Sequence, residues 1–371
     1  MRGSAAVLLM LAVAPLAHAD SQHGALDRHT TLWDEVVVVA TKRETSIRDV
    51  AADVTVIDDA DLQAILSTSL ADAFRFVPGV AHEASGSRFG SEGITIRGIG
   101  GNRIAVEIDG VPLSDQFDIG NFSNTTRDFA DTGLLGQVEV MRGPASALYG
   151  GSALGGVVAM RTLDPRHFNS DGATGGSLGS LYRGIDESAN TQASVILHGM
   201  PASLVLAGSY REGAERQSAA LAEPADTQSY RREALLLKLV GENRLGDDWQ
   251  VGAISQSHDA QTRITSVLGA GRFRSTTQLD GDDRHSMDML SGEYHFDTSL
   301  ISDGVARVFV TNTQVHQYTF DERAAARTPV FIDRDFHYEQ RKRGAELNVW
   351  RDAELRGWNH RFGAGLEYTE T

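Results

Sequence analysis

The chain lacks cysteine altogether and is poor in proline, with eight prolines among 371 residues. Without thiols it has neither a disulfide framework nor a thiolate metal site, so its stability must come from packing or from a lipid surround. Positive charge is also scarce, since the formal net charge is −16. Phosphate backbones are bound by clustered lysine and arginine, so this balance argues against a nucleic-acid partner. The 38 glycines favour tight turns and close-packed strands.

Long apolar runs are missing too, apart from one at the N-terminus. Residues 1–19 combine a positive Arg2, an apolar stretch and the cleavage pattern Ala17-His18-Ala19, which predicts a secretory signal peptide. The apolar stretch is shorter than the roughly 20 residues that a transmembrane helix needs. Any membrane span in the later chain is therefore predicted to consist of strands.

Complete catalytic signatures are absent. Residues 98–101 are glycine-rich, but Arg103 stands where a G-x-G-x-x-G loop needs its third glycine. Residues 175–179 match the letters G-x-S-x-G, yet they end a glycine-rich linker with no strand predicted before them and no helix after them. No P-loop or H-E-x-x-H pattern occurs, and the histidines are scattered. We therefore predict no enzyme activity, no intrinsic cofactor and no resident metal.

A loose arm is predicted to follow the signal peptide over residues 20–48. Residues 20–31 are polar and without period, and residues 34–40 read Asp-Glu-Val-Val-Val-Val-Ala. A continuous β-branched run after a loose arm is typical of an extended segment that pairs with a partner as an added strand. The alternative is a first core strand of the next domain.

Residues 49–165 are predicted to form a compact α/β domain. A strand over 54–57 precedes a helix that Asp58 or Asp59 caps and that extends through Leu66. Ser69 and Asp72 form a capping box for a second helix. The further strands are predicted at residues 93–98, 103–110, 138–141 and 156–162.

Three motifs follow one another in this domain: Ile96-Arg97-Gly98, Ile108-Asp109-Gly110-Val111, and residues 138–149 with a glycine-punctuated strand behind them. Together they resemble the plug of the TonB-dependent receptors, energised outer-membrane importers of iron complexes and other scarce nutrients. The resemblance implies that residues 49–165 are the plug and that residues 34–40 are the TonB box. The box is engaged by the periplasmic energy-coupling protein TonB. Its residues here are Glu35, Val36, Val37, Val38, Val39 and Ala40.

The resemblance also implies roles for single plug residues. Arginines at the motif positions of Arg97 and Arg142 pair in the family with carboxylates on the inner barrel wall. Residues 144–165 look most like the haem and haemoglobin/transferrin receptor branch, whose members commonly ligate haem iron through a histidine on an apical plug loop. Residues 111–135 contain no histidine, and His82, in an apparent loop, is the only histidine of the plug. It is either a haem ligand or a solvated loop histidine. The other candidates for substrate contact are Gln116, Phe117 and Phe122.

Residues 166–371 are predicted to be strands of a transmembrane β-barrel. Apolar and polar side chains alternate, as in a soluble sandwich, but short and long connections also alternate, as in outer-membrane barrels. The predicted turns are at residues 199–201, 243–247, 297–303 and 356–357, and the predicted long loops at 213–228, 264–284 and 321–335. About nine strands result, whereas plugged transporters have about 22. We therefore expect an incomplete barrel, either from a fragment or truncated product or because a partner supplies the rest.

These observations predict a TonB-dependent outer-membrane receptor. Its expected cargo is an iron-bearing complex, with haem or a haem protein favoured and a siderophore next. Its expected partners are TonB, the extracellular cargo and outer-membrane lipid. The alternatives are an oligosaccharide importer, for which Phe117 and Phe122 would supply stacking, and a truncated receptor fragment that does not transport. A signalling receptor is disfavoured, since residues 20–31 leave no room for an extra domain.

Overall fold

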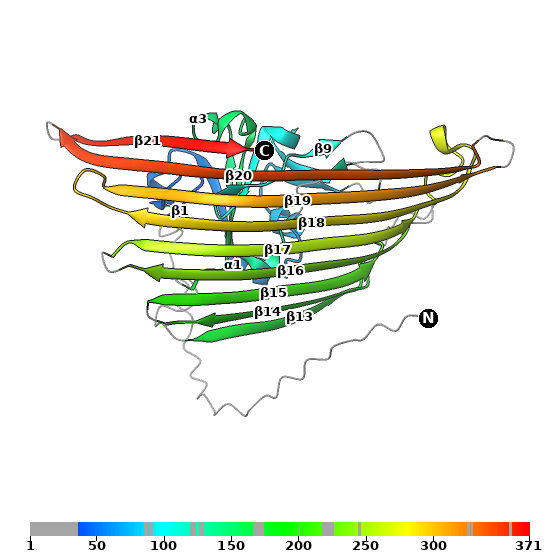
Figure 1. Cartoon of the computed structure of the whole chain (residues 1–371), viewed down its shortest axis with the longest axis horizontal. Helices are drawn as coiled ribbons and strands as arrows, with labels where there is room; N and C mark the ends of the chain where they lie inside the picture. The colour runs from blue at the N-terminus through cyan, green and yellow to red at the C-terminus, as the bar shows by residue number, and fades with distance from the viewer. Residues whose placement is uncertain are drawn as a thin grey trace, which may run out of the picture.

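The computed structural model describes residues 36–84, 88, 92–118, 124–125, 130–165, 174–199, 201–216, 226–243, 246–324, 327, 329–355 and 358–371. The predicted signal peptide, the first part of the arm with Glu35, and Phe122 lie outside these residues. The described chain forms a mixed α/β plug and a curved sheet of nine long antiparallel strands, and in Figure 1 the plug lies behind the sheet. This is the predicted fold class.

Five strands make the central sheet of the plug. Their order is β3 (Asp53–Asp58), β11 (Leu135–Arg142), β12 (Gly156–Thr162), β7 (Ile104–Ile108) and β8 (Val111–Pro112). β12 and β7 are parallel, and the other neighbours are antiparallel. The smaller plug sheets consist of β4 (Val80–Ala84), β5 (Glu92–Ile96) and β6 (Ile99–Gly100), of β1 (Val36–Val37) and β2 (Thr45–Ser46), and of β9 (Phe117–Asp118) and β10 (Asn124–Thr125).

The helices of the plug are short and begin where the sequence predicts. Asp58 caps α1 (Asp59–Ala64) by accepting from the Asp61 N–H, and Ser69 caps α2 (Leu70–Phe74) by accepting from the Asp72 N–H. The first helix ends before the predicted Leu66, which has a positive φ of 51°. The remaining helical elements are α3 (Ser146–Tyr149), η1 (Ile47–Asp49), η2 (Gly101–Arg103), η4 (Thr132–Leu134), η5 (Gly150–Ser152) and η6 (Gly271–Phe273). Among the described residues, no helix has the length and apolar character needed to cross a membrane.

The large sheet follows chain order from β13 to β21, and those two edge strands do not pair with each other. Its strands are β13 (Gly175–Arg183), β14 (Ser188–Leu197), β15 (Ala202–Ala214), β16 (Thr227–Glu242), β17 (Asp248–Arg263), β18 (Thr276–Phe296), β19 (Asp303–Arg323), β20 (Phe331–Leu355) and β21 (Trp358–Glu370). The predicted turn at residues 297–303 connects β18 to β19, and β14, β16 and β20 end just before the other three predicted turns begin. Residues 200, 244–245 and 356–357 of those three turns lie outside the described residues.

Two predicted loops are largely strand. β17 ends at Arg263 and β18 already begins at Thr276. Only residues 264–275 therefore remain of the predicted 264–284 loop. β19 and β20 likewise leave only residues 324–330 of the predicted 321–335 loop. These segments are polar on both faces, which resembles loop composition, yet ladder hydrogen bonds to neighbouring strands satisfy their backbone. β18, β19 and β20 therefore run for 21, 21 and 25 residues, well beyond the roughly 9–11 that cross a bilayer.

The two faces of the large sheet differ in chemistry. The outward face exposes apolar side chains on successive strands, including Val195, Leu206, Leu235, Leu237, Leu239, Val251, Leu290, Val308, Leu347 and Leu366. The inward face packs against the plug, and one buried cluster joins Leu70 and Ile108 of the plug to Leu236 and Phe309 of the sheet. A lipid-facing exterior and a plug-facing interior therefore follow from period-two alternation.

Candidate functional site at the plug and sheet interface

The run predicted as the TonB box is docked against the plug. Val37 and Val39 are fully buried, and β1 pairs with β2. The N–H groups of Val38 and Val39 each donate to the Glu139 carboxylate at 2.8 Å. The Tyr149 hydroxyl donates to the Val39 carbonyl at 2.9 Å.

In this docked state the N–H groups of Val38 and Val39 are already bonded within the plug, so they are not free for the strand pairing predicted from the sequence. Among the described residues the strand comprises Val36–Val37, and a turn follows in which the Lys42 N–H donates to the Val38 carbonyl at 2.8 Å. The turn directs apolar side chains into the plug, where burial stabilises each by about 1.5–3 kcal/mol. The docked state matches the alternative of a first core segment. Whether TonB binds this run stays a prediction.

Glu139 is the acceptor that holds the run. It lies on β11, in the interior of the five-stranded sheet, and is fully buried. Burial raises the pKa of Glu139, and the two valine N–H donors offset only part of this effect. The run is thus tied to an interior strand of the plug sheet by hydrogen bonds that a backbone displacement would break.

Lys42 connects the same run to the barrel wall. Its ammonium group lies 3.1 Å from a Glu346 oxygen on β20 and 3.7 Å from a Glu107 oxygen on β7. It also lies 4.2 Å from the centre of the Tyr149 ring. Burial acts to lower the pKa of Lys42, but Glu107 and Glu346 outweigh it and the pKa is raised. The ammonium group is therefore charged at neutral pH.

Arg307 completes this buried charge cluster from β19. Its guanidinium bonds the carboxylates of Glu293 and Glu346 and donates to the Gly110 carbonyl at 3.4 Å. Burial raises the pKa of Glu107, which faces the same cluster. The carboxyl groups of Glu107, Glu293 and Glu346 thus face the two cations Lys42 and Arg307 in one buried cluster.

The Asp109-Gly110 motif positions the plug over Arg307. Both residues have positive φ, 47° and 71°, which forms the tight turn between β7 and β8. A Cβ on residue 110 would collide with the Arg307 guanidinium, so glycine is required by space as well as by conformation. The Asp109 carboxylate accepts from the N–H and hydroxyl of Thr162 and lies 3.4 Å from the Lys238 ammonium on β16.

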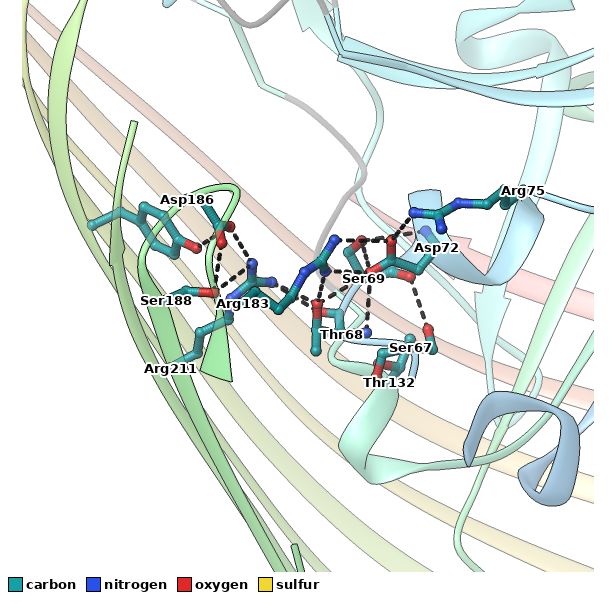
Figure 2. A network of polar contacts seen from close by, with 11 residues as sticks. Ser67, Thr68, Ser69, Asp72, Arg75, Thr132, Arg183, Asp186, Ser188 and Arg211 are labelled. Carbon is teal, nitrogen blue, oxygen red and sulfur yellow. Dashed lines mark hydrogen bonds and ion pairs between the residues drawn. The ribbon is translucent and has the colours of Figure 1, made fainter. Parts of the chain in front are cut away.

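A second network joins α2 to the first strands of the sheet (Figure 2). The Asp72 carboxylate accepts from Thr68, Ser69 and Arg75 in the plug and from Arg183 of β13, at 2.7 Å for the Arg183 Nη1 atom. Arg211 of β15 donates to the Thr68 hydroxyl at 2.9 Å. The same Arg211 bonds Asp186 of the β13–β14 turn at 2.6 Å. Two barrel arginines thus converge on the capping segment of one short plug helix.

The capping role and the docking role of Asp72 are linked. Burial alone would raise the pKa of Asp72, but hydrogen bonds from Arg183 and Thr68 outweigh it and lower the pKa. The carboxylate is therefore ionised at neutral pH and bonds the barrel arginine in its charged form. Its capping box was predicted from the sequence, whereas its barrel partners were not.

Arg88 makes a third contact, near the long connections of the sheet. Its guanidinium binds both oxygens of Asp283 on β18, at 2.5 and 2.6 Å. It also donates to the Thr319 hydroxyl at 2.7 Å and to the Tyr318 carbonyl at 2.9 Å. Gly281 leaves room for this side chain, because a Cβ there would collide with it. A bidentate pair of this kind fixes the orientation of the plug relative to the wall.

Arg97 and Arg142, which the resemblance pairs with the barrel wall, make contacts within the plug among the described residues. Both bind Asp53 on β3, at 2.5 Å from Arg97 and 2.7 Å from Arg142. The register explains this, because Arg142 lies directly opposite Asp53 in the pairing of β11 with β3. Arg142 first, and then Arg97, lower the pKa of the Asp53 carboxyl. Among the described residues, these arginines therefore brace the plug itself.

The predicted substrate contacts are separate in the structure. His82 is on β4, opposite Ile94 of β5, and not in a loop as expected, because its backbone continues the hairpin ladder. Gln116 exchanges backbone hydrogen bonds with the Asn102 side chain at 2.7 and 2.9 Å. Phe117 stacks on Tyr338 of the wall with ring centres 5.1 Å apart.

The sequence contains a signal for the missed interface residues. Lys238 and Arg307 each interrupt an apolar alternation, as Leu-Lys-Leu and Ala-Arg-Val, at positions of the inward register. A charge inside a lipid-crossing segment is costly unless it faces a partner or a cavity. Inward charges on predicted barrel strands therefore indicate plug contacts, although they do not identify the plug partner.

Known proteins share both parts of this arrangement. Residues 46–157 match the TonB-dependent Receptor Plug Domain family. The chain is 26% identical over 330 residues to the vitamin B12 transporter BtuB of Vibrio vulnificus, covering 85% of this chain and 52% of the transporter. It is 33% identical over 161 residues to the hemin receptor of Yersinia enterocolitica, covering 43% of this chain and 22% of the receptor.

A solved structure shows the same fold. The hemophore receptor HasR of Serratia marcescens, solved with its hemophore HasA and haem, aligns with a TM-score of 0.67 at 18% identity, over 86% of this chain and 45% of that one. The chain spans about half the length, or less, of the curated relatives described above. Residues 46–157 are therefore a TonB-dependent receptor plug domain, and the chain as a whole is similar in sequence and fold to the TonB-dependent receptors of the outer membrane.

Proposed function

We propose that the receptor to which this chain belongs imports haem or another iron-bearing complex, driven by a pull on residues 34–40. The observation that carries the proposal is the docking of this run on Glu139, on an interior strand of a plug that charged contacts hold against the large sheet. The similarity to the hemin receptor over 161 residues supports haem as cargo. The chain does no covalent chemistry in this process.

The contacts support a defined order of release. TonB would pair with the run as an added strand, whose ladder bonds the N–H groups of alternate residues and so needs one of the two N–H groups, of Val38 or Val39, that now donate to Glu139. The extended conformation breaks the shared contact with Glu139 and moves Lys42 away from Glu346. The plug then loses a link to β11 and a link to the wall together. Such charged contacts fix orientation at rest and yield to a mechanical pull.

The coupling proposal is tested in the full-length receptor with Val38→Pro. Proline removes an N–H that both the docked state and the TonB-bound state use. We expect cargo binding at the cell surface to persist and uptake to be abolished, as in a strain without TonB. Glu139→Gln, which keeps a side-chain acceptor, is the control and should retain uptake. Equal loss of binding in Val38→Pro would show that the run is only a core segment.

A specific observation favours a second cargo. The vitamin B12 transporter relative matches 85% of this chain, far more than the hemin receptor does. Cobalamin is therefore the competing cargo. The purified receptor should bind haem more tightly than cobalamin if the haem proposal holds, and the reverse order would replace it.

His82 is the proposed plug ligand of haem. In the full-length receptor, His82→Ala should weaken haem binding and change the visible absorption spectrum of the bound haem. An unchanged affinity and spectrum would remove His82 as a ligand. Phe117 and Gln116 are proposed as weaker contacts, since Phe117 already packs against Tyr338.

A further inference from the structure

Two histidines and an aspartate meet on the outward face of the large sheet. His316 of β19 lies directly opposite His337 of β20 in the strand register. Their rings stack with centres 4.1 Å apart and an angle of 9°. The Nε2 atoms lie 2.6 Å and 3.2 Å from the same Asp335 oxygen.

These side chains point away from the plug. Along β19 the odd-numbered neighbours Val315 and Gln317 are buried on the plug side, so His316 belongs to the opposite face. The side chains of His316, Asp335 and His337 are 40%, 55% and 69% exposed. His316 also lies six residues beyond the apolar outward position Val310, about 20 Å along the strand at 3.3 Å per residue. The cluster is therefore accessible from water and is separate from the interior route proposed for cargo.

We propose that His316, Asp335 and His337 form a binding site for a divalent transition-metal ion such as Zn²⁺. Their ligand atoms all lie within 4.8 Å of one another, the one such group of three or more among the described residues. A tetrahedral zinc ion with bonds of about 2.1 Å separates its ligand atoms by about 3.4 Å. Small rotations of exposed side chains bring the three atoms to that spacing.

The chemistry of the ligands determines the class of ion. Two imidazoles and one carboxylate suit zinc, copper and nickel, whereas calcium and magnesium prefer oxygen ligands alone. Three protein ligands leave one position open for water or for a group from outside the protein. The nearest charge across the ladder is Arg284, opposite His316, and its guanidinium is bound to Asp259 at 3.0 Å. The negative charge of Asp259 offsets the repulsion between the Arg284 guanidinium and a metal ion bound at the cluster.

The test compares metal binding by the full-length receptor and its variants in detergent, after chelator treatment and dialysis. Titration calorimetry with ZnCl₂ should show one more equivalent in the wild type than in His316→Ala or His337→Ala. The control is His360→Ala, an exposed histidine on β21 that is outside the cluster and should leave the stoichiometry unchanged. With Cu²⁺, the paramagnetic resonance spectrum should show coupling to two nitrogens, reduced in each cluster variant.

Folding is checked separately by heat-modifiable migration of each variant. If His316→Ala misfolds, His337→Gln replaces it, because His337 is the most exposed of the three ligands. Equal zinc stoichiometry in the wild type and all folded variants would overturn the proposal, as would a copper spectrum without nitrogen coupling. Since the readout is metal binding on the outer face, its result is independent of whether the receptor transports haem.

Discussion

The plug and the outward face of the large sheet place their apolar side chains differently. The plug buries its apolar side chains, with Leu70 and Ile96 at 0% exposure, whereas the sheet exposes Leu290 at 52% and Val308 at 60%. The sheet instead buries charges on its inward face. In a lipid bilayer, apolar side chains face outward and charged side chains face the interior. The inward charges of the sheet can therefore bind the plug. A charged side chain buried on the inward face of the sheet therefore indicates a contact with the plug, whereas an exposed charged side chain does not.

The largest effect is expected from the buried charge cluster. Arg307→Ala in the full-length receptor leaves the Glu293 and Glu346 carboxylates without their shared cation. The expected loss of stability is about 3–5 kcal/mol, because an uncompensated buried charge remains. It is measured by denaturant unfolding in lipid vesicles and by protease access to the plug.

The control for this variant is Arg343→Ala, which removes an exposed arginine paired with Glu370 on the outward face. It should leave both readouts unchanged. Equal effects of the two substitutions would show that the inward position of Arg307 has no special role. Arg307→Lys should recover part of the lost stability, since it restores the charge without the guanidinium geometry.

The next effect tests the outward face directly. Leu237 on β16 is 45% exposed, while its neighbour Leu236 is fully buried against the plug side. Leu237→Arg should destabilise the receptor in lipid by about 2–4 kcal/mol if the position lies near the middle of the bilayer. Ser229→Arg, on the same face but beyond the apolar rows, is the control and should have little effect. Identical unfolding curves for the two variants would contradict the proposed lipid-facing band.

The smallest of the three effects concerns the network around Asp72. Asp72→Asn keeps the shape of the side chain but removes the charge that Arg183 binds, so we expect a loss of about 2 kcal/mol. Because the folded-state pKa of Asp72 is lowered, its contribution is fully present above the unfolded carboxyl value of about 3.9. The contribution disappears as the pH falls through the lower folded value.

The measurement is protease access to the plug at a series of pH values. The difference between wild type and Asp72→Asn should be constant from about pH 5 to 8 and should shrink below about pH 4. Asp61→Asn, at an exposed position on α1, controls for the loss of a carboxylate. A difference that grows with acidity would reverse the assigned sign and contradict an ionised Asp72.

The sequence by itself determined the helix caps, the resemblance to the plug family and the approximate number of strands in the large sheet, but not the lengths of its longest strands. Asp58 and Ser69 cap their helices as predicted because a capping bond is made within three residues. The alternation of apolar and polar side chains identified the strands, because apolar side chains on every second residue face lipid.

Only the tertiary structure decided which charges meet. Arg142 lies opposite Asp53 because of the register of β11 with β3. Arg183 reaches Asp72, and Val39 reaches Glu139, only through the docking of distant segments. These contacts join residues about 90 to 110 positions apart, and no local pattern encodes such a pairing. The physical reason is that alternation places a charge on a face, whereas register and docking select its partner.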